Sequence, residues 1–338
     1  MASYNAPRRG SLAFYPRVRV RKETPSIKAS SDQAKALSFL GYKVGMIQVS
    51  GVNNHKNSPS FGQEIVTAVT VVECPALKVM GIRAYEKAEI GFNPMTDVLA
   101  PNFDKEILRK INNFKTKSEK NKKADSKKTE EKEYTVDDLH KELNDIEYFT
   151  LLVNTQASKI GFKKTPDITE LFIGGNKEEQ LKFAKEMLGK EINVEDVFGE
   201  GEYLDVKGVT KGKGFQGVIK RFNVKQQRPK AKKRRIVGSI SPWHPHTVMW
   251  TVPRAGQMGY HNRTEFSKKL GLISTDLDKI NGINGFINYG PVKTKYILIM
   301  GSIPGPAKRC IAFRKSQRPL KIKGVQMQTI EKILIKKK

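Results

Sequence analysis

Residues 206–264 combine cations, imidazoles and glycines with a complete lack of carboxylates. These 59 residues contain 14 Lys/Arg and three His but no Asp or Glu. With 34 acids in 338 residues, the average composition would place about six acids in such a window. Lysines and arginines without internal acidic partners remain available for phosphates, so the window predicts a polyanion partner.

Two imidazoles in this window, His244 and His246, have the H-x-H spacing of many metal ligands. A zinc site needs a third or fourth ligand, and the neighbouring sequence offers no carboxylate or thiolate. Ser241 beside His244 likewise lacks the acid that would orient a catalytic histidine. We therefore predict no catalytic residue, no metal and no cofactor.

The motif GKGFQG, residues 212–217, formally matches G-x-G-x-x-G. A dinucleotide fold would require an acid about 20 residues later, and none occurs before Glu265. A Walker loop is excluded because Gly214 stands where the magnesium-binding Ser/Thr must be. A kinase glycine loop is excluded because no H-R-D or D-F-G motif follows it. What remains is a tight turn between strands, where Lys211 and Lys213 and the bare backbone of Gly212, Gly214 and Gly217 can approach phosphate.

A basic run and a tryptophan follow this turn. Trp243 stands between Pro242 and Pro245, without apolar neighbours in sequence, which favours a rigid exposed tip over a core position. Trp250, in VMWTV, fits core packing as well as RNA contact. Cations beside flat rings suit RNA, because splayed bases stack on aromatic side chains. The cations of the run are Arg228, Lys230, Lys232, Lys233, Arg234 and Arg235.

Charge is unevenly distributed along the chain. The formal net charge is +28, yet residues 97–205 hold 24 acids and 19 bases, which leaves +33 on the rest. Only the basic frame is therefore expected to meet the polyanion. Aliphatic runs such as Tyr296–Met300 are too short to span a bilayer and the N-terminus lacks a secretory pattern, so we expect a cytoplasmic protein with neither a membrane partner nor a small-molecule substrate.

Short β-rich stretches bounded by turn residues must position these groups. Their pattern predicts a mainly β fold, a barrel or a sandwich, interrupted at residues 97–200 by a small α/β insertion. Cys74 and Cys310 are expected to be buried. The expected strands are Tyr42–Val49, Ile65–Val72, Val79–Tyr85, Tyr203–Val209, Gly217–Phe222, Tyr296–Met300 and Cys310–Phe313, with Tyr148–Val153 and Leu171–Ile173 in the insertion.

Inside the insertion, Thr135 to Asp138 resembles a capping box ahead of a helix with Leu139, Leu143 and Ile146 on one face. A second helix opens at Asn176 to Glu179 and stops near Gly189. Residues 115–133 are rich in Lys and Glu and predict a mobile loop without chemistry.

Two segments have little apolar periodicity. Residues 1–37 predict an arm that is ordered by its partner, with Arg8, Arg9, Arg17 and Arg19 as RNA-binding candidates. Residues 223–263 predict a basic finger loop with one strand at Val248–Val252. The globular domain would then comprise residues 38–96, 201–222 and 264–338.

Four segments together resemble the universal L-three family of large-subunit ribosomal proteins, in its archaeal type. They are spread in order over most of the chain. They are GSLAFYPRVR (Gly10–Arg19), VTKGKGFQGVIKRF (Val209–Phe222), WHPHTVMWTVPRAGQMGYHNRTE (Trp243–Glu265) and GSIPGPAKR (Gly301–Arg309).

The resemblance implies a closed β-barrel domain with an extended N-terminal arm and a long central loop that penetrates the rRNA. It implies binding to large-subunit (23S-type) rRNA near its 3′ end, nucleation of subunit assembly, contacts with neighbouring large-subunit ribosomal proteins, and a loop directed toward the peptidyl transferase centre. It implies that Trp243 is the loop tip, accompanied by His244 and Pro245, and that the returning segment contributes Arg254, Gln257, Tyr260, His261 and Arg263. His246 beside this tip is a further RNA-binding candidate.

Two departures separate this chain from the family pattern. The basic run at 228–235 agrees with the family in charge more than in identity, and the loop at 115–133 matches no motif. The resemblance implies that the protein performs none of the peptide-bond chemistry itself, so the chain is expected not to be an enzyme. The alternative is an RNA-modifying enzyme that uses the His- and Gly-rich loop together with a carboxylate from the insertion.

Overall fold

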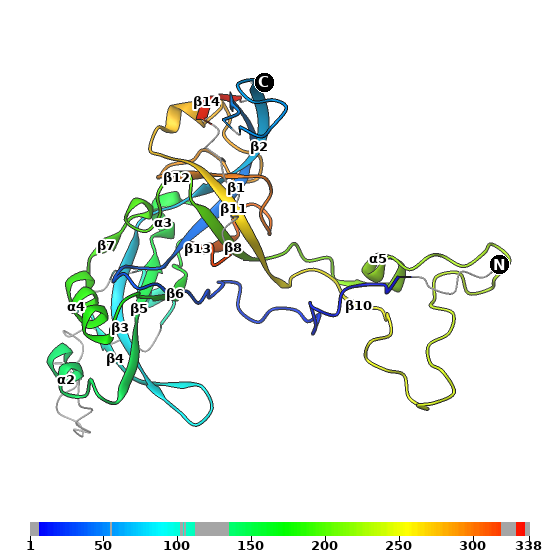
Figure 1. The fold of residues 1–338 in the computed structure, drawn as a ribbon, viewed down its shortest axis with the longest axis horizontal. Coiled ribbons are helices and arrows are strands. Elements are labelled where there is room, and N and C mark those ends of the chain that lie inside the picture. The colour runs from blue at the N-terminus through cyan, green and yellow to red at the C-terminus, as the bar shows by residue number, and fades with distance from the viewer. Residues whose placement is uncertain are drawn as a thin grey trace. The chain divides into compact units, whose positions relative to one another are not determined.

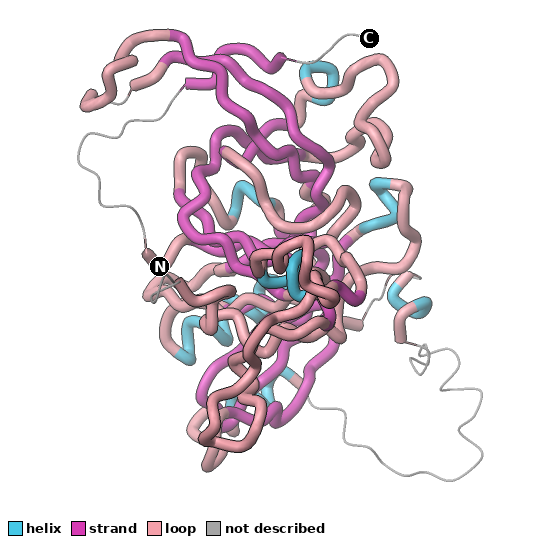
Figure 2. Tube along the Cα trace, turned by 90° about the vertical axis from the view of Figure 1, so that its right-hand side faces the viewer, coloured by secondary structure: helices cyan, strands magenta, loops and turns pink. Residues whose placement is uncertain are grey.

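A computed structural model describes residues 7–54, 56–101, 104, 106–111, 135–318 and 329–334. The predicted mobile loop at 115–133 lies outside these residues. The chain divides into two compact units, residues 1–23 with 209–263 and residues 24–208 with 264–338; we refer to them as the basic unit and the core unit. Strands account for most of the regular structure (Figure 2), which confirms a mainly β fold.

A seven-stranded sheet has the order β13-β8-β11-β12-β2-β1-β14 (Figure 1). β13 also pairs with β1, so the pairings return to their starting strand. β2 shows why these segments are strands: its run EIVTAVTVVE is rich in β-branched residues that fit a pleated surface. The members are β1 (Ser38–Val52), β2 (Glu64–Glu73), β8 (Tyr203–Val209), β11 (Asn262–Ser274), β12 (Tyr296–Met300), β13 (Cys310–Lys315) and β14 (Thr329–Leu334).

A second sheet of five strands belongs to the core unit. β3 (Leu77–Lys87), which the sequence groups with the first sheet, pairs here with β4, β5 and the short β7. The helix α4 (Lys177–Met187) lies against β5 (Figure 1). The other strands are β4 (Phe92–Leu99), β5 (Ile146–Thr155), β6 (Ile168–Phe172) and β7 (Glu191–Ile192).

The predicted capping box is present, and the second predicted helix start also has one. Thr135 and Asp138 form the first, at the start of α2 (Val136–Lys141), and Asn176 and Glu179 form the second, ahead of α4. Each box satisfies backbone N–H groups that lack a partner within the helix. The predicted extent of α2 was wrong, because the helix ends at Lys141 and Ile146 already opens β5. Short helical turns complete the unit: η1 (Ile107–Arg109), α3 (Ala157–Ile160), η2 (Val194–Asp196) and η3 (Leu277–Lys279).

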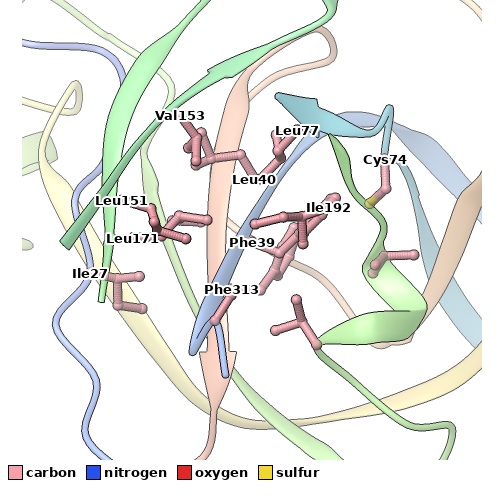
Figure 3. Packing of buried hydrophobic residues seen from close by; sticks show 14 of the residues in the cluster. Ile27, Phe39, Leu40, Cys74, Leu77, Leu151, Val153, Leu171, Ile192 and Phe313 are labelled. Atoms are coloured by element: carbon pink, nitrogen blue, oxygen red, sulfur yellow. The ribbon is translucent and has the colours of Figure 1, made fainter. Parts of the chain in front are cut away.

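The hydrophobic core of the core unit draws on both sheets. Phe39 from β1, Phe313 from β13 and Leu151 from β5 are fully buried in one cluster (Figure 3). Cys74 and Cys310 are buried and free, which confirms the prediction of burial. Burying such side chains contributes roughly 1.5 to 3 kcal/mol each, so this cluster is the main source of stability for the unit.

Buried charges in the core unit have partners. Glu73 accepts hydrogen bonds from the Tyr289 hydroxyl, from the backbone N–H groups of Lys293 and Thr294, and from the Thr294 hydroxyl. Burial, together with the nearby Glu73 carboxylate, raises the pKa of Tyr289. Asp205 lies 3.1 Å from the Arg314 guanidinium and accepts the Ser267 N–H. Paired in this way, these carboxylates avoid the large cost of an isolated buried charge.

The basic unit contains little regular structure. β9 (Phe215–Gln216) pairs with β10 (Gly256–Gln257), and α5 spans Val218–Phe222. The predicted strand Gly217–Phe222 was therefore wrong. Its buried residues, Val218 and Phe222, are four positions apart, as on one face of a helix, and Asn223 ends the turn with a left-handed φ of 55°.

The predicted strand Val248–Val252 was also wrong. Val248 and Met249 are exposed, and the Val252 N–H bonds to the Met249 carbonyl in a turn. Apolar alternation there does not mark a buried face, because no strand in the part of the chain that the structure describes pairs with this segment. Among the described residues no helix combines the length and apolar character needed to cross a bilayer.

Candidate nucleic-acid interface

The N-terminal segment and the central loop are joined by arginine side chains and a backbone bond. Arg8 donates to the Thr251 carbonyl at 2.8 Å and Arg9 to the Asn223 carbonyl at 3.4 Å. The Val20 N–H bonds to the Tyr260 carbonyl at 3.0 Å. Two segments that are far apart in sequence therefore form one surface, with Arg8 and Arg9 spending part of their donor capacity inside the protein.

Arg17 lies between aromatic rings. Its guanidinium carbon is 4.3 Å from the Phe222 ring centroid and 5.4 Å from that of Tyr15. Such cation–π contacts stabilise a cation by roughly 0.5 to 2 kcal/mol while leaving its charge intact. Tyr15 in turn meets Trp250 edge-on at 5.0 Å, so Trp250 packs on the arm and still keeps an exposed face. The aromatic residues thus hold Arg17 in place.

Arg221 organises the returning segment, and the sequence analysis did not select it. Its guanidinium donates to the carbonyls of Gln257 and Arg254, each at 2.9 Å, and to Arg17 at 3.4 Å. Because three carbonyls bind one planar guanidinium group, the distances between the segments that carry these carbonyls are fixed. The only local sign of this role was that Arg221 belongs to the basic motif VIKRF. In the structure this motif forms α5, from which Arg221 reaches the carbonyls of the loop.

The glycine turn is pinned by backbone bonds. The Lys213 N–H donates to the Met258 carbonyl and the Met258 N–H to the Gly214 carbonyl, both at 2.9 Å. Gly214 and Gly259 have φ of +65° and +70°, a region that glycine occupies without strain. A Cβ on Gly259 would lie only 2.0 Å from the Lys211 carbonyl oxygen, so the two segments meet there in a contact only glycine permits.

The three glycines chosen from the sequence differ in their surroundings. A Cβ on Gly214 or Gly217 would meet no heavy atom within 4 Å, whereas one on Gly212 would touch Tyr260 at 3.7 Å. The backbone at Gly214 and Gly217 is therefore open to an approaching group. At Gly212 one side is already covered by protein.

His261 is buried at the base of this turn. Its Nδ1 lies 2.8 Å from the Val18 carbonyl, which can only accept, so Nδ1 carries the proton. Burial lowers the pKa of His261, and Arg263, Arg221 and Arg17 lower it further, whereas the bond to Val18 raises it. A neutral imidazole at this point joins the arm to the loop without adding charge.

A pocket of about 410 Å³ opens between the arm and the glycine turn. Burial, followed by repulsion from Arg17, lowers the pKa of Arg221 and of Arg263. Arginine stays charged at any ordinary pH, so the repulsion persists until an anion enters. The lining residues are Arg17, Thr210, Lys211, Lys213, Arg221, Met258, Gly259, His261 and Arg263.

The pocket brings together five of the residues selected from the sequence: Arg17, Lys211, Lys213, His261 and Arg263. Tyr260 lies outside it, with Arg19 5.1 Å from its ring centroid and its hydroxyl donating to Glu23. The side chain of Gln257 donates to the Met258 and Gly259 carbonyls, which makes it part of the turn. Arg254 contributes its carbonyl to Arg221 and exposes its side chain.

The basic run and the tip lie apart from the pocket. All six cations of the run, in the range 228–235, are exposed. Trp243 is 81% exposed, and the rings of His244 and His246 are 4.7 Å apart. No group of three or more His, Cys, Asp or Glu side chains that could hold a metal occurs in the part of the chain that the structure describes.

The arrangement can bind a chain of phosphates. Residues 1–23 and 209–263 hold 19 Lys/Arg and one acid, Glu23, a formal charge of +18. Pocket, run and tip offer cations together with exposed aromatic rings, the two kinds of group that RNA-binding surfaces use.

Comparison with known proteins agrees with this chemistry. The sequence profile described as Ribosomal protein L3 matches residues 1–336. Large ribosomal subunit protein uL3 of Methanobrevibacter smithii is 45% identical over 328 residues, which cover 94% of each chain. Proteins of the same name from Archaeoglobus fulgidus and Picrophilus torridus are each 42% identical over 94% of this chain, covering 94% and 93% of their own lengths. The chain belongs to the ribosomal protein L3 family.

Proposed function

We propose that this chain is a structural constituent of the large ribosomal subunit and that its basic unit binds large-subunit rRNA. The observation that carries the proposal is the +18 charge of that unit, together with a pocket where Arg17 repels both Arg221 and Arg263. Phosphate binding relieves this repulsion and releases counterions from the RNA.

The proposal gives the parts of the basic unit distinct tasks. The pocket residues grip the backbone, the cations at 228–235 neutralise further phosphates, and Trp243 with His244 and His246 contacts RNA bases at the loop tip. Binding lies near the 3′ end of the rRNA and nucleates assembly, with the loop directed toward the peptidyl transferase centre. Family membership supports this assignment.

In the core unit, the return of the strand pairings through β1 and β13 supports a closed β-barrel. Residues 97–200 form the α/β insertion, and neighbouring large-subunit proteins are the partners we assign to the core unit. The protein acts in the cytoplasm, on the ribosome, without a catalytic step of its own.

The test measures the affinity of the full chain for protein-free large-subunit rRNA from its own organism as salt is raised. If six to ten phosphates are contacted, affinity falls about 10³- to 10⁵-fold between roughly 50 and 200 mM salt. An affinity that does not change with salt would contradict the proposal.

A matched pair of triple variants locates the contact. The salt slope is the steepness with which the logarithm of the affinity falls as the logarithm of the salt concentration rises. Replacing Lys211, Lys213 and Arg263 by Ala lowers this slope by about one for each lost phosphate contact. Replacing Lys141, Lys185 and Lys279, which are exposed in the core unit, leaves the slope unchanged. Equal slopes in both triple variants would move the interface away from the pocket.

A further inference from the structure

Phe215 is an exposed aromatic residue in a rigid setting. Its side chain is 78% exposed, although it belongs to the strand pair β9–β10 and stands opposite Gln257. Leaving a phenylalanine in water forfeits the stabilisation that burial would provide. The next residue, Gln216, donates its side-chain N–H to the Lys213 carbonyl at 2.6 Å, so the backbone beneath the ring is held.

The surroundings of Phe215 are cationic. Lys213, two residues earlier, lines the pocket, and so does Met258, which follows the strand partner Gln257. Two residues of chain span at most about 7 Å, so the backbone of Phe215 lies close to that of the pocket residue Lys213. The open backbone at Gly214 and Gly217 flanks it on both sides and leaves room for a planar ligand.

This combination selects one kind of partner. The centres of protein interfaces are depleted of charge, whereas this ring belongs to a unit with 19 Lys/Arg and a single acid. Nucleobases stack on aromatic side chains while cations hold the adjacent phosphates. A base inside a helix has both faces covered, so the stacking base must be unpaired or splayed out.

We propose that Phe215 and the arginine pocket form one nucleotide-binding site, in which an unpaired base of the rRNA stacks on the Phe215 ring and an adjacent phosphate enters the pocket. The inference rests on the proposed function and adds a residue and a ligand class to it. The pocket supplies affinity that depends on salt, and the ring supplies affinity that does not.

Three substitutions separate a stacking surface from a merely apolar one. In binding to protein-free large-subunit rRNA at fixed salt, Phe215→Ala lowers affinity about 5- to 150-fold, the range for loss of one stacked base. Phe215→Leu, which keeps bulk but has no aromatic face, behaves like the alanine variant. Phe215→Trp keeps the wild-type affinity within about threefold, because the larger ring still stacks.

The salt slope identifies which part of the site is affected. All three Phe215 variants keep the wild-type slope, whereas Lys213→Ala lowers it by about one. Phe61→Ala is the matched control, since Phe61 is also an exposed phenylalanine but belongs to the core unit, and it leaves the affinity unchanged. Phe215 is exposed, so its replacement leaves the thermal unfolding midpoint unchanged.

Two results would overturn the inference alone. Wild-type affinity in Phe215→Ala, or full affinity in Phe215→Leu, would show that no base stacks there even though the protein binds rRNA with the expected salt slope. If the wild-type chain itself fails to bind, or binds with no salt dependence, the proposed function fails and the nucleotide site fails with it.

Discussion

The two units of this chain hold themselves together in different ways. The core unit is organised around buried aliphatic and aromatic side chains, and its buried carboxylates are paired. In the described part of the basic unit, the buried apolar side chains are Val209, Val218 and Phe222. Arginine bonds to backbone carbonyls and cation–π contacts take the place of a core there.

The difference shows what a chain needs in order to be folded before it meets its partner. Hydrophobic burial is complete within one molecule, so the core unit does not depend on RNA for its stability. The contacts of the basic unit fix a surface but leave most of its charge uncompensated, as expected of a surface that a polyanionic partner completes.

The largest expected effect concerns the buried ion pair of the core unit. Asp205→Ala leaves Arg314, whose side chain is mostly buried, without its partner, and lowers the free energy of unfolding by about 3 to 5 kcal/mol. Denaturant unfolding monitored by circular dichroism measures this loss. As control, Asp276→Ala removes the exposed pair with Lys279 and has a much smaller effect, because water and salt screen exposed charges.

Equal losses in these two variants would show that burial does not distinguish the pairs.

Two side-chain truncations compare how much an apolar residue of each unit contributes to the free energy of unfolding. Leu151→Ala removes a fully buried side chain from the core and costs about 2 to 5 kcal/mol. Val248→Ala removes an exposed side chain from the finger loop and changes the free energy of unfolding by less than about 0.5 kcal/mol. Both are measured by thermal or denaturant unfolding of the protein without RNA. A large cost at Val248 would mean that the loop has a core of its own.

Arg221 tests whether carbonyl bonds replace a core in the basic unit. Arg221→Ala removes donors to Gln257 and Arg254, and each charged hydrogen bond contributes about 1.5 to 3 kcal/mol. Hydrogen exchange of the Lys213 and Met258 amides should accelerate accordingly, while the core strands keep their protection.

Arg221→Lys is the informative control, because lysine keeps the charge but lacks the planar fork. We expect its amides to exchange nearly as fast as those of the alanine variant. Wild-type protection in the lysine variant would show that charge, and not geometry, holds the turn.

The smallest effect is a pH dependence in the core unit. Burial and the hydrogen bond to Glu170 raise the pKa of Tyr85 to about 12, above its ordinary value of 10. The folded state therefore binds this proton more tightly, and the resulting stability is complete below pH 10 and lost as pH rises through 12.

The difference in free energy of unfolding between the wild type and Tyr85→Phe measures this contribution. It should shrink from pH 10 to pH 12, and a constant difference across that range would contradict the shifted pKa.

The sequence predicted features that depend on local chemistry. Asn176 and Glu179 announce a helix start because a capping box is complete within four residues. The strand at Tyr203–Val209 was found to the residue, and the burial of Cys74 and Cys310 was predicted correctly. Charge alone separated the basic segments from the acidic insertion.

Features that depend on distant partners were missed. The apolar pattern of VIKRF predicted a strand, but the segment forms a helical turn that ends at the left-handed Asn223. Phe222 in this turn packs against Arg17, a residue about 200 positions earlier that no local pattern contains. The structural role of Arg221 depends on carbonyls more than 30 residues away, which no local pattern contains. Phe215 escaped notice because its exposure becomes visible only once the turn is folded.

The basic unit joins residues from two ends of a long interval of synthesis. Residues 1–23 emerge first, and 185 further residues must be translated before Val209 appears. At about 5 to 20 residues per second this takes roughly 10 to 40 seconds. Throughout that time the arm carries six Lys/Arg, and the carbonyls of Asn223, Thr251 and Tyr260 that later bind it do not yet exist. A nascent chain of this design passes through a stage when a strongly cationic segment is available to any nearby polyanion.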